Sequence, residues 1–414
     1  MSSPVTALRD AIDLIAGDAA VPLRDARPVV RTQLQGAHDA LFAPAHGDYG
    51  FTPAERSVIA LYVAALHRDQ AAIGYYGARV NELGVAGEIE EAVLSLADES
   101  AVPGPFGEYP ADTVLAAESV AGPSLSLPLS SVFGLRLARG LEFAHRVLLH
   151  PRDTTAEHLT GLREAGWSGD QTVILTQIVA ALSFQLRVAI GARALAATYA
   201  GEPGEPDGAQ RSPRRGHPSP YPGASGDHPR AFTDLIVAWK PWIEVPAQDP
   251  HAGFDWVGAF GKRRASSPSF RLSARDPFVS LPLSRLEDDI FADGATGLGR
   301  AERELGALTV SRENGCVYCA SVHSRATAKF SGRAADVRAV LDDGPRVDLG
   351  DPWNVFADAA LALTATPVAF TPAQAADLRR AAGDPEAALD FVHSVGYFNF
   401  ANRIMLALGE PVLS

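Results

Sequence analysis

The sequence almost lacks cysteine: Cys316 and Cys319 are the only two among 414 residues, and they stand three positions apart. One close pair cannot form the disulfide framework that holds small secreted domains together. In a reducing compartment, an isolated pair with this spacing is more often redox-active or metal-binding than structural. The pair is therefore the first candidate for a functional site.

A surplus of positive charge is also missing. The formal net charge is -13, the pI is about 5.3, and Lys and Arg form no cluster. Such a chain is repelled by phosphate backbones and anionic lipid surfaces, so we expect neither nucleic acid nor a membrane as a partner. We also find no uninterrupted apolar segment at the N-terminus typical of a signal peptide, and no run of about 20 apolar residues. These features predict a soluble, cytoplasmic protein.

Strand-like alternation of apolar and polar residues is scarce as well. Alanine-rich windows instead carry apolar residues at the spacing of a helix face. Two segments have a capping-box start with proline at the first helical position, one beginning at Thr52 and one at Thr371. The sequence therefore predicts an all-α protein.

One segment differs sharply in composition from the rest. Residues 201–229 are dominated by Gly and Pro, and they contain almost no apolar side chains. Such a segment cannot bury enough apolar surface to become ordered, which is typical of a linker. We therefore expect a helical domain without cysteines at 1–200, the linker at 201–229, and a domain with both cysteines at 230–414.

The two halves of the chain resemble each other. When Leu162 is aligned with Leu378, the last long apolar segments of the halves match without a gap. This alignment pairs Phe184 with Phe400 and Arg187 with Arg403. Chance similarity between Ala- and Leu-rich helices is the alternative. A gapless match that includes Phe and Arg favours duplication.

Farther upstream, "AERSVIAL" around Glu55 resembles "AERELGAL" around Glu304. From there to the later helices, the spacing is longer in the first half than in the second. Most of this excess falls near residues 100–131, which are rich in Pro, Gly and Ser. We expect those residues to form a surface excursion.

The cysteines follow Asn314-Gly315, a strong local break that can start a new helix. A helix from about Cys316 would place Cys319 and His323 near the same face. Cysteines at i and i+3 have Cα atoms about 5 Å apart, which a disulfide tolerates. The first helical turn and a nearby imidazole both favour the thiolate.

Glu304 precedes Cys316, and the complete pattern is Glu-x11-Cys-x2-Cys-x3-His. On one continuous helix, Glu304 and Cys316 would be separated by about 18 Å along the axis, too far for an interaction. If the chain folds back at Gly315, Glu304 comes toward His323 as an orienting or proton-accepting partner.

This pattern resembles that of the AhpD-like alkylhydroperoxidases in the carboxymuconolactone decarboxylase superfamily. "NGCVYCASVH" is similar to the peroxidase-related branch, and "FNFANRIMLALG" is similar to its closing helix. The resemblance covers residues 230–414 well and is weaker over 1–200. It implies two tandem AhpD-like helical domains joined by the Pro/Gly-rich linker, in chains that associate as homo-oligomers. It also implies hydroperoxide reduction without a cofactor or metal, with re-reduction by a thiol donor such as a lipoyl-bearing protein.

Carried over residue by residue, the resemblance makes Cys319 the peroxide-attacking thiolate and Cys316 the resolving thiol. His323 and Glu304 become the proton relay. Tyr318 stands where the better-known hydroperoxidases have a second histidine, so the implied relay is shorter here.

The first half lacks this pattern. When the spacing is counted from Glu55, His67 and Gln70 stand in place of the two cysteines. A small slip in the alignment sets Tyr76 opposite His323. We expect this half to have a structural or substrate-shaping role. A thiol-free reaction of the decarboxylase kind by Glu55 and His67 is the alternative.

Other functions stay open for the site as a whole. Cys316, Cys319, His323 and Glu304 could supply four zinc ligands, although single zinc sites usually take a second ligand pair from a distant loop. The cysteines could report oxidation without turnover, or a carboxylate and an imidazole could serve a cofactor-free lyase. The Trp-rich residues 238–256 either pack the entrance of the second half or wall an apolar substrate pocket.

Overall fold

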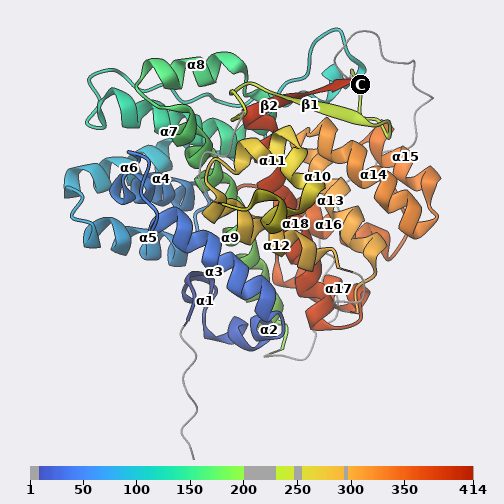
Figure 1. Ribbon diagram of the computed structural model, residues 1–414. Coiled ribbons are helices and arrows are strands. Elements are labelled where there is room, and N and C mark those ends of the chain that lie inside the picture. The colour runs from blue at the N-terminus through green and yellow to red at the C-terminus, as the bar shows by residue number, and fades with distance from the viewer. Residues whose placement is uncertain (1–8, 200–229, 247–253, 293–296, 414) are drawn as a thin grey trace, which may run out of the picture.

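The computed structural model describes residues 9–199, 230–246, 254–292 and 297–413 (Figure 1). Within these ranges the chain forms 18 α-helices and one two-stranded antiparallel sheet. The prediction of an all-α protein is confirmed. The proposed linker at 201–229 lies outside the described residues.

Nine α-helices belong to the described part of the first half, here taken as residues up to 199. They are α1 (Ala11–Ala16), α2 (Val21–Asp25), α3 (Pro28–Phe42), α4 (Pro53–Leu66), α5 (Gln70–Glu82), α6 (Gly87–Ser100), α7 (Gly134–Leu149), α8 (Ala156–Glu164) and α9 (Gly169–Ala197). Short 3-10 helices add η1 (Asp18–Ala20), η2 (Val114–Glu118) and η3 (Pro151–Asp153).

The described part of the second half, from residue 230 onward, holds the remaining elements. They are β1 (Val237–Pro241), α10 (Trp256–Ser266), α11 (Pro268–Ser273), α12 (Pro277–Ile290), α13 (Arg300–Asn314), α14 (Val317–Ser331), α15 (Ala334–Asp343), α16 (Trp353–Thr364), α17 (Pro372–Ala382), α18 (Pro385–Leu408) and β2 (Gly409–Leu413). The two strands were not predicted; they pair in antiparallel register, with Val237 opposite Leu413.

The two longest helices, α9 and α18, pack against each other in the middle of the molecule (Figure 1). Both are buried on nearly all sides, which is why neither shows a polar face. Glycines allow their close approach: a Cβ at Gly191 would lie 2.6 Å from Val392, and a Cβ at Gly396 would lie 2.6 Å from Phe184. The core of the protein therefore joins the two halves.

Helix α9 is more apolar than the sequence analysis expected, since no segment there was judged long and apolar enough to span a membrane. It contains an 18-residue window with a mean hydropathy of 1.8, so by length and composition it could cross a membrane. However, 94% of that window is buried inside the protein. Its apolar character is explained by its contacts with α18, α4 and α7.

Two buried arginines link the halves reciprocally. Arg187 in α9 donates from Nη1 to the carbonyl of Ser183, one turn earlier in the same helix (2.8 Å). Its Nη2 donates to the Thr364 carbonyl at the end of α16 (2.7 Å). Arg403 in α18 donates in the same way to the Asn399 carbonyl and to the Leu148 carbonyl near the end of α7, both at 2.9 Å. The alignment that pairs the two arginines also pairs their partner residues. The contacts agree with the internal similarity, and the duplication stays a prediction.

Both predicted capping boxes are present. The Thr52 side chain accepts from the Glu55 N–H, and the Thr371 side chain accepts from the Gln374 N–H, each at 3.2 Å. Proline occupies the first helical position of both α4 and α17, where its missing N–H has no intrahelical partner to lose. Local sequence alone thus sets the start of these two helices.

The excursion at 100–131 is largely irregular, as expected, but it also contacts the second half. The Gly104 N–H donates to the Thr366 carbonyl at 2.8 Å. Glu118 accepts two hydrogen bonds from Arg312 of α13, both at 2.7 Å. The excursion therefore braces the helix that leads to the cysteines.

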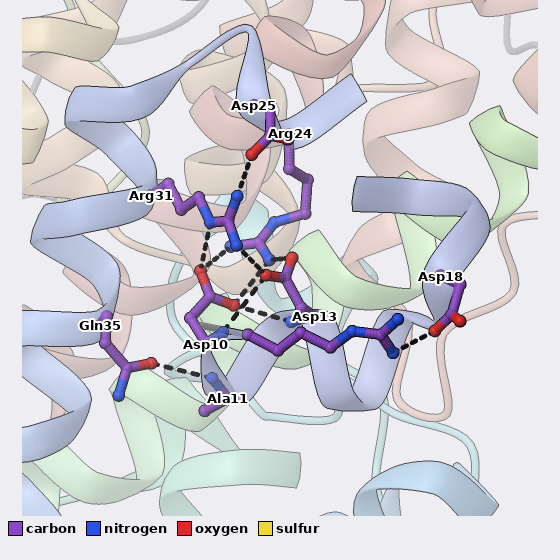
Figure 2. Close-up of polar contacts among 9 residues, drawn as sticks. Asp10, Ala11, Asp13, Asp18, Arg24, Asp25, Arg31 and Gln35 are labelled. Atoms are coloured by element: carbon purple, nitrogen blue, oxygen red, sulfur yellow. Dashed lines mark hydrogen bonds and ion pairs between the residues drawn. The ribbon is translucent and has the colours of Figure 1, made fainter. Parts of the chain in front are cut away.

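A cluster of ion pairs holds the N-terminal helices together (Figure 2). Arg24 of α2 donates to both carboxylate oxygens of Asp10, at 2.7 and 2.9 Å, and it also pairs with Asp13 of α1. Arg31 of α3 contacts the same two aspartates. Burial raises the pKa of Asp10, but the Arg24 hydrogen bonds and charge outweigh this effect and lower it overall. The cluster fixes α1, α2 and α3 to one another.

Candidate active site

A sharp turn between α13 and α14 builds the site. Gly315 ends α13 with φ 85°, a left-handed conformation that glycine adopts without strain. Cys316 then caps α14, and its Sγ accepts from the Cys319 N–H at 3.4 Å. The two helices pack against each other. The predicted fold-back at the Asn-Gly break is therefore confirmed.

Both cysteines are free and buried, with 1% of Cys316 and 4% of Cys319 exposed. Their sulfur atoms lie 2.9 Å apart, longer than the S–S bond of about 2.05 Å and close enough for that bond to form after a small movement. Burial raises the pKa of the Cys319 thiol well above its usual value, and the contact with Cys316 adds to this effect. A hydrogen bond with Asn402 acts in the opposite direction.

The expectation that the helix terminus favours the Cys319 thiolate stays a prediction, and burial acts against it. Removal of the sulfur from water opposes its charged form. The raised pKa favours the neutral thiol of Cys319 at neutral pH.

Glu304 and His323 form the predicted pair. The distance from His323 Nδ1 to Glu304 Oε2 is 2.6 Å, and Arg300 Nε donates to the other carboxylate oxygen at 2.7 Å. Glu304 is only 1% exposed, and this burial raises its pKa. The charges and hydrogen bonds of His323 and Arg300 outweigh burial, so the pKa of Glu304 lies below its usual value. The carboxylate is therefore charged at neutral pH.

The contact with Glu304 also orients the imidazole of His323. In the neutral ring, Nδ1–H donates to the carboxylate, which leaves Nε2 as the acceptor. The Phe398 ring packs edge-on against the imidazole, with ring centroids 4.0 Å apart. His323 follows Cys319 by one helical turn on α14. The side chains of His323 and Cys319 therefore share one face of α14.

A cavity of about 340 Å³ opens beside these two residues. Cys319 and His323 line it, whereas Cys316 and Glu304 do not. Side chains from α10 to α12, α14 and α18 complete the walls: Arg263, Arg264, Ser267, Ser269, Phe270, Ser273, Glu287, Tyr318, Val322, Tyr397, Phe398, Phe400, Ala401, Ile404 and Met405. Of the two sulfurs, Cys319 is the one that a substrate in this cavity can reach.

The described parts of the Trp-rich segment, 238–246 and 254–256, contribute no residue to this cavity. Trp239 in β1 instead packs into the core and donates from Nε1 to the Met405 carbonyl at 3.0 Å. The cavity wall comes from the next segment, where Phe270 is the contributing aromatic residue. Of the two roles considered for residues 238–256, packing fits Trp239.

Sequence reasoning missed Arg300 and a buried amide network. Asn314 Nδ2 donates to Asn399 Oδ1 at 3.3 Å and lies 3.1 Å from the side-chain amide of Asn402, which ties the α13 end to α18. The signal was present in "FNFANRIML", where two asparagines interrupt an apolar helix. Buried amides of this kind require partners, so they mark a specific contact. Arg300 could have been found from its i,i+4 spacing to Glu304.

The structure corrects the register between the halves. Arg68 (φ 56°) and Gly315 (φ 85°) adopt the same left-handed conformation just before Asp69 and Cys316, the N-caps of α5 and α14. An alignment of Arg68 with Gly315 also matches the letters of "AERSVIAL" and "AERELGAL" directly. Glu55 then corresponds to Glu302. The pairing of Glu55 with Glu304 was wrong by two positions.

In the corrected register, Ser57 takes the place of Glu304 and Tyr76 that of His323. Asp69 and Ala72 replace the cysteines, not His67 and Gln70. The Ser57 hydroxyl and the Tyr76 hydroxyl are buried without a hydrogen-bond partner among the described residues. The first half thus has the helical frame of the site without its acid, base or thiols.

Glu55 and His67 do not form a reactive pair. They stand at the two ends of α4, about 18 Å apart along the helix axis. Glu55 caps the helix and pairs with Arg136 at 3.2 Å. Burial, together with the charges of Arg187 and Arg403, lowers the pKa of His67 well below its usual value. The alternative of a Glu55/His67 reaction is therefore wrong.

The zinc alternative gains no support from the geometry. Over the described ranges, no group of three or more His, Cys, Asp or Glu side chains is arranged to hold a metal ion. Both oxygens of Glu304 are already engaged by His323 and Arg300.

Fold and site together define an all-helical protein with a buried Cys-x2-Cys pair beside a Glu–His dyad. Residues 283–348 match the model of the Carboxymuconolactone decarboxylase family, and this segment includes all four candidate residues. The resemblance to this family is confirmed over the matched segment. No curated protein matches the chain. The matched residues lie in the second half, so the tandem duplication stays a prediction.

Proposed function

We propose that the second half is a thiol-dependent hydroperoxide reductase. The observation that carries this proposal is the position of Cys319. Its sulfur lies 2.9 Å from the Cys316 sulfur, lines a cavity, and stands one helical turn from a histidine that a buried carboxylate orients. The family match fits either a peroxidase or a decarboxylase-like activity. The adjacent thiols favour the peroxidase.

The first step oxidises Cys319. His323 Nε2 takes the thiol proton, and Cys319 Sγ attacks the terminal peroxide oxygen. The O–O bond breaks, Cys319 becomes a sulfenic acid, and the alkoxide takes the proton from His323 and leaves as an alcohol. Glu304 does not touch the reacting atoms. It is a positioning residue that stabilises the imidazolium.

Tyr318 can assist the leaving oxygen. Burial raises the pKa of its hydroxyl, as do the neighbouring Cys319 and Cys316 sulfurs. The hydroxyl is thus protonated at neutral pH, and Tyr318 lines the same cavity as Cys319. It can donate a hydrogen bond to the developing alkoxide, in the position where the family pattern has a second histidine.

The second step forms the disulfide. Cys316 Sγ attacks the sulfenic sulfur, the S–S bond forms, and the hydroxyl group leaves as water with the proton of the Cys316 thiol. Two electrons have then passed from the two thiols to the peroxide. A dithiol, such as a lipoyl-bearing protein, returns the site to its reduced form. We place this cycle in the cytoplasm, in a homo-oligomer.

Steady-state turnover tests the proposal. With cumene hydroperoxide and dithiothreitol, Cys319→Ser should lose activity entirely. Without added dithiol, Cys316→Ser should react once and stop at a sulfenic acid or an intermolecular disulfide. If Cys319→Ser kept wild-type turnover, the proposal would be wrong.

A cofactor-free lyase is the second candidate, favoured by one observation. Burial keeps Cys319 protonated, whereas the Glu304–His323 pair is complete as a base without any thiol. In this case Cys319→Ser should retain most of the activity on a lactone carboxylate, and His323→Gln should abolish it.

A further inference from the structure

The cavity beside Cys319 has an unpaired cation in its wall. Arg263 lines the cavity and is exposed. Among the described residues its guanidinium makes no ion pair or hydrogen bond, and its charge acts on the Tyr318 hydroxyl, whose pKa it lowers against the larger effect of burial. Arg263 follows Gly261, whose φ of 75° breaks α10 and redirects the chain. An arginine in this position can contact a cavity ligand without giving up another partner.

The neighbouring charged groups pair with one another and not with Arg263. Arg264 pairs with Glu287 at 2.8 Å and with Asp288 at 2.7 Å, so these carboxylates already have a cation. Burial and the Glu287 charge both raise the pKa of the Tyr397 hydroxyl. Glu287, which itself lines the cavity, is thus held by Arg264, and the two arginines and two carboxylates together carry no net charge. Arg263 is the one of the four without an ion pair among the described residues, so it can turn to a ligand.

Two hydroxyls and an apolar surface complete this end of the cavity. Ser267 and Ser269 line it, with their oxygens 3.0 Å apart. The remaining wall toward α18 is apolar, with Phe270, Phe398, Ile404 and Met405. A volume of about 340 Å³ lies within the range of small-molecule pockets. An arginine and hydroxyls at an apolar cavity are a typical site for a small carboxylate with a hydrocarbon body.

We propose that the cavity binds amphipathic carboxylates, and that the substrate is a medium-chain or aromatic acid with a hydroperoxide group. Arg263 holds the carboxylate, the apolar wall holds the hydrocarbon, and the hydroperoxide faces Cys319. The assignment of the hydroperoxide rests on the proposed function. The carboxylate preference does not, because it concerns binding alone.

The test compares two ligands that differ only in the charged group. Binding of octanoate and of 1-octanol is measured by calorimetry with the full chain, for wild type, Arg263→Gln and Arg163→Gln. Arg163, on α8, is the control because it is also exposed and makes no ion pair among the described residues. Thermal melting confirms that each variant is folded.

Wild type should prefer octanoate, and Arg263→Gln should weaken octanoate binding about fivefold, as expected for a partly exposed ion pair. Octanol binding should change less than twofold, and Arg163→Gln should change neither. Equal binding of the two ligands by wild type, or octanoate binding that Arg263→Gln leaves unchanged, would overturn the carboxylate assignment. Turnover of cumene hydroperoxide, a neutral peroxide, is measured in parallel, so a failure of the proposed function is detected separately.

Discussion

Replacement of Glu304 by Gln tests how the proton relay works. The variant keeps the shape of the side chain but removes a charge that is 1% exposed and lies 2.6 Å from His323 Nδ1. With charge centres about 4 Å apart and an effective dielectric constant of about 20, a carboxylate stabilises an imidazolium by about 4 kcal/mol. Since about 1.4 kcal/mol is a factor of ten, the loss corresponds to about 10³-fold in rate.

We therefore expect Glu304→Gln to slow peroxide reduction by about 10²- to 10⁴-fold and to raise the apparent pKa of Cys319. The pH dependence of Cys319 alkylation measures the second effect directly. Glu302→Gln makes the same change two positions away on α13, and Glu55→Gln makes it at the first-half counterpart of Glu302. Both controls should stay within twofold of wild type.

An unchanged alkylation profile in Glu304→Gln would refute this reasoning, as would an equal shift in either control. Stability offers a second check on the same charge. Because the folded pKa of Glu304 lies below its ordinary value of 4.5, its contribution to stability is complete above that pH and is lost as the pH falls through the folded pKa. Glu304→Gln should remove this part of the acid sensitivity in denaturant titrations.

The remaining predictions concern stability and assembly. Arg187→Ala and Arg403→Ala should each lower the free energy of unfolding by about 3–5 kcal/mol in urea titrations, because each leaves a buried void and unpaired carbonyls; a loss below about 1 kcal/mol in either would show that these contacts do not hold the halves together. Thr52→Ala and Thr371→Ala should each cost about 1 kcal/mol through loss of an N-cap, and equal stability to wild type would contradict the capping account. Light scattering should give a multiple of 43.6 kDa for a homo-oligomer, whereas the monomer mass at micromolar concentration would exclude stable self-association.

Much of the site could be predicted because its determinants are local. Asn314-Gly315 marked the turn, and the spacing of Cys319 and His323 on one helix face followed from the helical period. Glu304 was identified because a reversal of the chain at Gly315 brings it next to His323, whereas on one continuous helix it would be too far away to interact.

The parts that were missed depend on packing between distant segments. Arg263 and Phe270 reach the cavity from helices that the periodicity alone does not place. The raised pKa of Cys319 depends on how deeply the core covers it, and the charge pattern along the chain does not contain that information. The alignment of the first half with the second was wrong by two positions because Glu55 was paired with Glu304 on residue type alone. The left-handed residues Arg68 and Gly315 give the correct alignment, in which Glu55 pairs with Glu302.

The most direct test of the central claim is the stoichiometry of a single oxidation. The reduced protein, in buffer free of added thiol, is mixed with one equivalent of tert-butyl hydroperoxide, and the intact mass, the Cys316–Cys319 peptide and the released alcohol are quantified. The account predicts one alcohol and one intramolecular disulfide per chain, with a mass loss of two hydrogens. Unreacted peroxide with both thiols still free to alkylate after denaturation would contradict it.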